Sequence, residues 1–220
     1  MQNGRSLDAP GLLFLFYIDK IDTSVENGDA KMISKKERTR ETILSVTYEL
    51  FAREGFNKIT MKDICEATGM SRGGLYSHFG STRKVFEAIL EKMNQKDEMN
   101  FEKEMEAGMP AVDILDRALT LMREEMEHAK DSLSLAMYEY ACTCSDDRMN
   151  HFHEVGEQKW SDLIKYGISR DEFNAVEIDE IVHVILYVYQ GIRMWSRIVR
   201  MPPVVFDSII NHIRKQLVKE

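Results

Sequence analysis

The segment from Thr60 to Phe79 constrains the fold of this chain more than any other part of it. It predicts two short helices joined by a tight turn at Gly69. Thr60 and Ser71 stand where a hydroxyl accepts backbone N–H groups at a helix start, and Asp63 completes a near capping box with Thr60. Gly69 follows the first helix, where a left-handed residue without a Cβ is favoured. The pattern is typical of a helix-turn-helix, whose second helix lies in the DNA major groove.

The charge of the chain is divided between its regions. The formal net charge is -8, which alone argues against a nucleic-acid partner. Residues 31–84, however, hold eleven Lys and Arg against six Asp and Glu, whereas residues 85–220 hold sixteen against twenty-six. A basic module joined to an acidic body fits a protein that touches phosphate with one end only.

The rest of the chain predicts an all-α fold. Ser34 and Glu37 form a capping box that opens a helix ending at Gly55, so three helices fit between about residues 34 and 77. No alternating strand pattern appears. Further helices are expected at about 82–107, 111–129, 132–144, 147–167, 177–200 and 204–218.

The first thirty-one residues are expected to be an extension outside the fold. The apolar run at residues 11–18 is too short to span a bilayer, and its flanks do not match a secretory signal. Met32 begins a sequence that looks like an ordinary start for a DNA-binding domain, so we expect translation to begin there and residues 1–31 to be a disordered tail or a mis-assigned start. Three cysteines without a disulfide framework favour the cytoplasm, with no membrane partner.

The same segment resembles the TetR family of transcriptional regulators. The resemblance implies a homodimer with a helix-turn-helix DNA-binding domain at residues 32–82 and a ligand-binding and dimerisation domain at residues 83–220. It covers about residues 34–90 and rests on Phe51, Gly55, Phe56, Thr60, Asp63, Ile64, Ala67, Gly69, Met70, Ser71, Gly73, Leu75, Tyr76, His78 and Phe79.

The resemblance also implies the contacts with double-stranded operator DNA. Tyr76 and His78 would touch phosphates, while Arg72 and the two glycines after it would face base edges, for which an Arg at a helix start is well suited. The sequence departs from the family pattern at Gly74 and at Thr82, which stands where a Lys is usual. The expected DNA-binding residues are Thr60, Ser71, Arg72, Gly73, Gly74, Tyr76, His78, Thr82, Arg83 and Lys84.

A small hydrophobic or aromatic effector is expected in the C-terminal domain. Methionine is abundant, at 14 residues, and Met-rich surfaces adapt to apolar ligands. The expected pocket residues are Met122, Met126, Met137, Tyr138, Phe152, Trp160, Tyr187 and Trp195. Each of them also fits an ordinary core or interface position. Glu125, Glu139 and Glu154 would add a preference for cations, although acidic side chains on helices are usually solvated.

The last two predicted helices are expected to form the homodimer. Two consecutive apolar helices suit a four-helix bundle across a two-fold axis. His183 lies on or near this stripe and fits a core or interface position. The apolar stripes consist of Ile178, Ile181, Val182, Ile185, Tyr189, Ile192 and Val199, followed by Val204, Val205, Ile209, Ile210, Ile213 and Leu217.

The alternatives from other classes find less support. Cys142 and Cys144, with His151 and His153, would make a thiol or metal sensor, but an i, i+2 spacing on a helix places the two side chains on different faces. No phosphate loop, nucleophile elbow or His-Glu-x-x-His pattern indicates an enzyme, and no metal or cofactor is expected. We therefore expect a repressor that a ligand releases from a palindromic operator. A DNA-binding protein without a small-molecule effector, and activation in place of repression, stay open.

Overall fold

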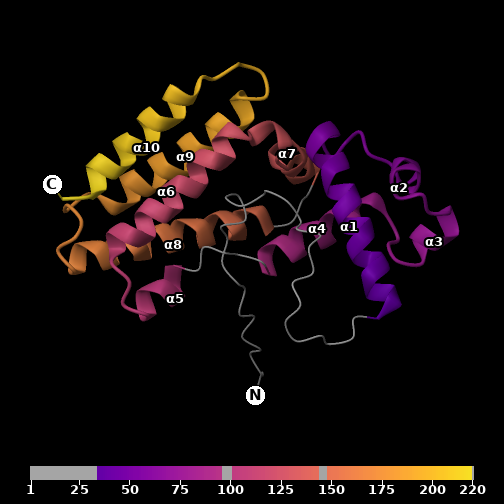
Figure 1. Ribbon diagram of the computed structural model, residues 1–220, viewed down its shortest axis with the longest axis horizontal. Coiled ribbons are helices and arrows are strands. Elements are labelled where there is room, and N and C mark those ends of the chain that lie inside the picture. The colour runs from indigo at the N-terminus through magenta and orange to yellow at the C-terminus, as the bar shows by residue number, and fades with distance from the viewer. Residues whose placement is uncertain (1–33, 96–100, 144–147, 220) are drawn as a thin grey trace.

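The described part of the chain is helical, as predicted (Figure 1). The computed structural model describes residues 34–95, 101–143 and 148–219. Over these ranges the element order is α1 (Lys35–Glu54), α2 (Met61–Thr68), α3 (Arg72–Tyr76), α4 (Thr82–Gln95), α5 (Phe101–Glu106), α6 (Ala111–Glu127), η1 (Ala129–Asp131), α7 (Ser134–Thr143), α8 (Arg148–Ser169), α9 (Ile178–Trp195) and α10 (Pro203–Leu217). Phe173 and Val218 form an isolated antiparallel bridge. None of the described helices is long and apolar enough to cross a membrane.

Both predicted capping boxes at the start of the fold are confirmed. At α1, the Ser34 hydroxyl accepts the Glu37 N–H, and the Glu37 carboxylate accepts the Ser34 N–H at 2.9 Å. At α2, Thr60 and Asp63 form the same reciprocal pair. Each pair satisfies two backbone groups that a helix end otherwise leaves without partners. The first turns of α1 and α2 are therefore fixed by hydrogen bonds between residues only three positions apart in the sequence.

The molecule is elongated and contains two hydrophobic cores. Figure 1 places α1, α2 and α3 at one end and α6, α8, α9 and α10 at the other. The first core draws on α1 to α4, α7 and the residues next to these helices. It contains, among others, Ile43, Tyr48, Phe51, Ile64, Leu75, Phe86 and Tyr140. The second core lies among α5, α6, α8, α9 and α10 and contains, among others, Phe101, Leu115, Met122, Trp160, Ile185, Tyr189 and Phe206.

The first core extends past residue 82. Buried residues of α4 as far as Leu90 belong to it, together with Met137 and Tyr140 of α7. The Tyr140 ring packs against Phe56 and Phe86, with ring centroids 5.3 and 5.2 Å apart. Helix α7 is thus packed on the N-terminal module, although it follows α6 in the chain. The domain division at residue 82 stays a prediction from sequence.

Several sequence predictions lie outside the described residues. These are the extension at residues 1–31 and the start at Met32, the stretch at residues 96–100 between α4 and α5, and Cys144.

Candidate nucleic-acid interface

The turn at Gly69 sets the direction of the short helix α3. Gly69 has φ 68° and ψ 14°, the left-handed conformation expected for it, which a glycine adopts without steric cost. Ile64 of α2 and Leu75 of α3 are fully buried, and Phe79 just after α3 is 3% exposed. Because these apolar side chains attach α3 to the core by one side, its other side faces outward.

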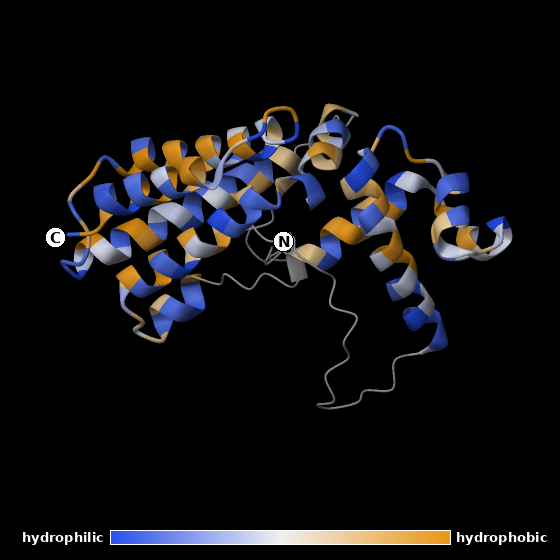
Figure 2. Ribbon diagram, turned by 45° about the horizontal axis from the view of Figure 1, so that its top comes forward, coloured by the Kyte–Doolittle hydropathy of each residue, from blue (hydrophilic) through white to orange (hydrophobic). Residues whose placement is uncertain are grey.

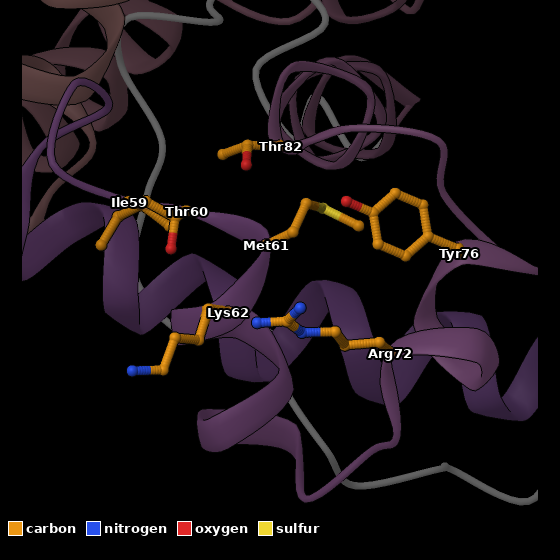
Figure 3. A pocket seen from close by; sticks show the side chains of 7 residues that line it. All are labelled: Ile59, Thr60, Met61, Lys62, Arg72, Tyr76 and Thr82. Atoms are coloured by element: carbon orange, nitrogen blue, oxygen red, sulfur yellow. The ribbon is translucent and has the colours of Figure 1, made fainter.

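A hollow of about 470 Å³ lies between α2, α3 and the start of α4 (Figure 3). Arg72 and Tyr76, one turn apart on α3, both point into it in this view, and Tyr76 is 52% exposed. The residues that line it are Ile59, Thr60, Met61, Lys62, Arg72, Tyr76 and Thr82. The structure therefore brings together four of the expected DNA-binding residues, from the start of α2, both ends of α3 and the start of α4, around one open concave surface.

The hydroxyls of Thr60 and Ser71 are occupied by capping. The Thr60 hydroxyl donates to Asp63 Oδ2 at 2.6 Å, and the Ser71 hydroxyl accepts the Gly74 N–H at 3.2 Å. The Thr60 hydroxyl and N–H hold the pKa of Asp63 below its usual range, because both stabilise the ionised carboxylate. Since the pKa of Asp63 is depressed in the folded state, this stabilisation is present above its ordinary pKa and is lost on acidification.

A second hollow, of about 510 Å³, joins the start of α1 to the end of α3. It is lined by Lys35, Lys36, Thr39, Ser77 and His78. His78 is held against α1, because Arg40 donates to its carbonyl at 3.4 Å and stacks over the Phe79 ring at 4.2 Å from the ring centroid. A cationic surface of this kind suits phosphate oxygens.

Sequence analysis missed three lysines of these two hollows. Lys35 and Lys36 follow the helix cap at Ser34, and Lys62 is in the first turn of α2. The excess of Lys and Arg over Asp and Glu in residues 31–84 indicated a basic surface. It did not show which side chains form that surface.

Two expected DNA-binding residues make contacts within the protein. Arg83 donates to the carbonyl of Thr143 at 3.2 Å and stacks over Tyr140, so it ties α4 to the end of α7. Lys84 is exposed and pairs with Glu87 at 2.7 Å. An exposed pair of this kind contributes little to stability and can exchange its partner for phosphate.

The two glycines of α3 differ in their surroundings. A Cβ added at Gly73 meets nothing within 4 Å, whereas one at Gly74 lies 3.2 Å from the Ser71 hydroxyl and 3.5 Å from Met70. Within the described residues no contact requires Gly73 to lack a side chain. Its absence of a side chain is consistent with a close approach of another molecule to this backbone.

The eight expected pocket residues do not form one group. Three are fully buried in the second core: Met122, Met126 and Trp160. Two belong to or pack against the first core: Met137 and Phe152. Three are exposed by more than half: Tyr138, Tyr187 and Trp195. Met122, Met126 and Trp160 are thus the predicted residues that share the interior of the C-terminal domain.

The three glutamates considered for cation preference have separate environments. Glu125 is buried, with Oε2 3.8 Å from Nη1 of the equally buried Arg193. Glu139 accepts the Asn57 N–H at 2.8 Å, and Glu154 is exposed. The carboxylate of Glu125 therefore faces the guanidinium of Arg193, a cation of the protein itself, in place of a cationic ligand. Arg193 was not singled out from the sequence, because it lies inside an otherwise apolar helix stripe.

Polar contacts join the end of α1 to the segment that follows α9. Arg197, just after α9, donates to the carbonyls of Ala52 and Arg53 at 3.3 and 3.5 Å, and to that of Lys130 at 2.9 Å. These α1 carbonyls lie at the negative end of the helix dipole, where a cation is favourable. The last turn of the first helix is therefore attached directly to the end of α9.

Cys142, His151 and His153 are the described members of the cysteine and histidine pairs. Cys142 is exposed at the end of α7, and Cys144 lies outside the described residues. His151 is exposed, whereas His153 lies 3.0 Å from the Tyr187 hydroxyl and 3.2 Å from Glu157. In the described ranges no group of three or more His, Cys, Asp or Glu is arranged to hold a metal.

The capped turn, the outward side of α3 and the two basic hollows define a helix-turn-helix DNA-binding protein. Residues 43–89 match the family model described as bacterial regulatory proteins of the tetR family. These residues therefore carry a DNA-binding domain similar to that of the TetR family of transcriptional regulators, as the segment from Thr60 to Phe79 indicated.

Similar proteins are transcriptional regulators rather than enzymes. YfiR, an HTH-type transcriptional regulator of Bacillus subtilis, is 29% identical over 147 residues, which cover 64% of this chain and 71% of YfiR. KstR2, an HTH-type transcriptional repressor of Rhodococcus jostii, is 21% identical over 145 residues, covering 64% and 71%. A TetR-family regulator from Agrobacterium tumefaciens superposes with a TM-score of 0.70 at 12% identity, covering 84% of this chain and all of that one.

Arg72→Ala and Tyr76→Ala are each expected to weaken binding to DNA carrying the operator. Loss of a bidentate base contact costs about 1–3 kcal/mol, and loss of a phosphate contact lowers affinity across sequences. Both side chains are exposed, so the free energy of unfolding should change by no more than about 0.5 kcal/mol. Fluorescence anisotropy and thermal unfolding measure the two effects. Arg53→Ala, exposed at the far end of α1, is the control, and unchanged binding of both variants would refute the assignment.

Gly73→Ala is expected to separate folding from DNA binding. The new methyl group meets no protein atom within 4 Å, so stability should stay equal or rise by up to about 1 kcal/mol. DNA affinity should fall, because the methyl group occupies the space into which the DNA comes. Chemical denaturation and anisotropy titration give the two values for one variant. A Gly73→Ala protein that binds DNA as tightly as the parent contradicts the close approach.

Proposed function

We propose that this protein is a repressor that binds a palindromic operator as a homodimer and leaves it when a small apolar effector binds the C-terminal domain. The observation that carries the proposal is the exposure of Arg72 and Tyr76 on a helix whose start is capped and whose inner side is buried. Such a helix presents fixed side chains to a groove at little entropic cost. The name of KstR2, a repressor, agrees with repression.

An exposed apolar surface at the C-terminal end supports the dimer. Single exposed apolar residues are ordinary, whereas several large ones on consecutive segments favour an interaction site. Figure 2 shows apolar residues recurring along the helices of this half. The exposed large residues on α9, its connection to α10 and the start of α10 are Val184, Tyr187, Trp195, Ile198, Val199 and Val204. Tyr187 and Trp195 therefore fit an interface better than the interior pocket expected for them.

The dimer supplies the spacing that two half-sites need. Paired recognition helices read half-sites about 34–36 Å apart, one helical turn of DNA. An effector releases the protein only if its affinity differs between the state that fits this spacing and a state that does not. Arg197 contacts the last turn of α1, and Glu139 contacts the N–H of Asn57 just after it, so a shift of α7 or α9 is transmitted to this region.

Binding to the gene's own upstream DNA tests this function. Footprinting should protect a palindrome there, with affinity falling steeply as salt rises because phosphates are neutralised. A panel of apolar compounds should contain members that weaken this binding. Protection of no palindrome overturns the proposal. Palindrome binding that no compound changes favours the alternative, a DNA-binding protein without a small-molecule effector.

Tyr187→Asp is expected to shift the dimer towards monomer. The substitution removes the large aromatic ring of Tyr187 and brings a charge into the proposed interface. Tyr138→Asp on α7 is a matched control, because both tyrosines are 59% exposed and only Tyr187 lies on the proposed interface. Sedimentation velocity on the full chain measures the mass. A Tyr187→Asp protein that stays as dimeric as the Tyr138→Asp protein places the interface elsewhere.

A further inference from the structure

Arg193 is the one charged residue among the largest fully buried side chains of the described residues. It is 1% exposed, near the end of α9. Its Nη1 donates to the Tyr189 hydroxyl at 2.9 Å and lies 3.8 Å from Glu125 Oε2. A buried guanidinium is costly to desolvate, so its remaining N–H groups are expected to meet acceptors.

Two of the three guanidinium nitrogens of Arg193, Nε and Nη2, have no hydrogen-bond acceptor within the described part of the chain. These two nitrogens form the side edge of the guanidinium, from which two N–H groups project in parallel. Their spacing matches the two oxygens of a carboxylate, which an arginine binds in a bidentate manner.

The charges around Arg193 favour a single negative charge at that edge. Burial lowers the pKa of Arg193, and the nearby Glu125 carboxylate and Tyr48 oppose this shift. An arginine nevertheless stays protonated in proteins. Glu125 comes closest at Nη1, which leaves the Nε–Nη2 edge to another acceptor. A dianionic phosphate would bring more charge than one guanidinium, already facing Glu125, can balance.

Apolar and adaptable side chains lie next to this pair. Met122 and Met126 are on α6, three residues before Glu125 and one after it, and both are fully buried in the second core. Methionine changes rotamer easily and fits ligands of different shapes. The neighbourhood thus offers the Nε–Nη2 edge of one buried guanidinium, with Glu125 and Tyr189 at Nη1, next to apolar side chains of α6.

We propose that the Nε–Nη2 edge of Arg193 binds the carboxylate of an organic monoacid whose apolar body lies among the residues of the second core. The inference rests on the proposed effector function and gives the effector its chemical class. The site also lies one turn before Arg197, which holds the carbonyls of α1. An acid bound at Arg193 therefore acts on the end of α9, which Arg197 attaches to α1 of the DNA-binding domain.

The test compares acids with amides of the same shape on the full-length protein. The probes are phenylacetate and octanoate against phenylacetamide and octanamide, at constant ionic strength. The acids should raise the thermal unfolding temperature and bind at least about tenfold more tightly in calorimetry, because a hydrogen bond to a charged group is worth this much or more. The amides are uncharged and cannot form the same charge-assisted pair with the Nε–Nη2 edge of Arg193.

Two variants make the result specific. Arg193→Met alone removes the cation facing the buried Glu125, so the double variant Glu125→Gln/Arg193→Met, which carries neither charge, is the informative one. It should fold and lose the preference for acids. Arg214→Met is the control, because Arg214 pairs with Asp116 at the surface of the same domain and should leave acid binding unchanged.

The outcomes separate this inference from the proposed function. Equal binding of acids and amides, no binding of either, or an acid preference that survives in the double variant overturns the carboxylate site. A neutral compound that releases the protein from its operator, with the acids inactive, also overturns the site but leaves the repressor function standing. Acids that bind at Arg193 while no operator is found uphold the site and overturn the repressor function.

Discussion

The last turn of α1 is the point on which the two halves of the molecule depend. Helix α1 supplies Ile43, Tyr48 and Phe51 to the first core, and its final carbonyls accept hydrogen bonds from Arg197 of the second half. Carbonyls at a helix end otherwise need water or a cap. Because Arg197, just after α9, satisfies them, this contact attaches the DNA-binding module to the C-terminal half.

The same region combines apolar packing with buried charge. Phe51, Phe56, Phe86 and Tyr140 form an aromatic cluster that binds α7 to the N-terminal module. Aromatic packing of this kind resists deformation, whereas removing one partner of the buried Glu125–Arg193 pair leaves an uncompensated buried charge. A rigid aromatic contact thus joins α7 to the N-terminal module, and a buried polar contact joins α6 to α9.

The parts of the fold that sequence predicted depend on short-range interactions. The boxes at Ser34 and Thr60 join residues three positions apart, and the conformation of Gly69 is a property of that residue itself. The contacts that sequence missed are long-range: Arg83 reaches a carbonyl sixty residues away, and Arg193 faces a glutamate on another helix. A helical stripe predicts which side is buried but not which neighbour buries it. For that reason the expected pocket residues were scattered over two cores and the surface.

Because α1 is attached at its last turn, a small tilt there moves its first turn by a larger distance. Its 20 residues extend over roughly 30 Å, with Arg197 holding one end and Lys35 and Lys36 at the other. A tilt of about 6° at the held end moves the far end by about 3 Å, the length of one hydrogen bond. The far end borders the same hollow as His78, beside the recognition helix. A small tilt at the end of α1 that Arg197 holds is therefore enough to make or break a contact between a phosphate and the lysines at the other end of the helix.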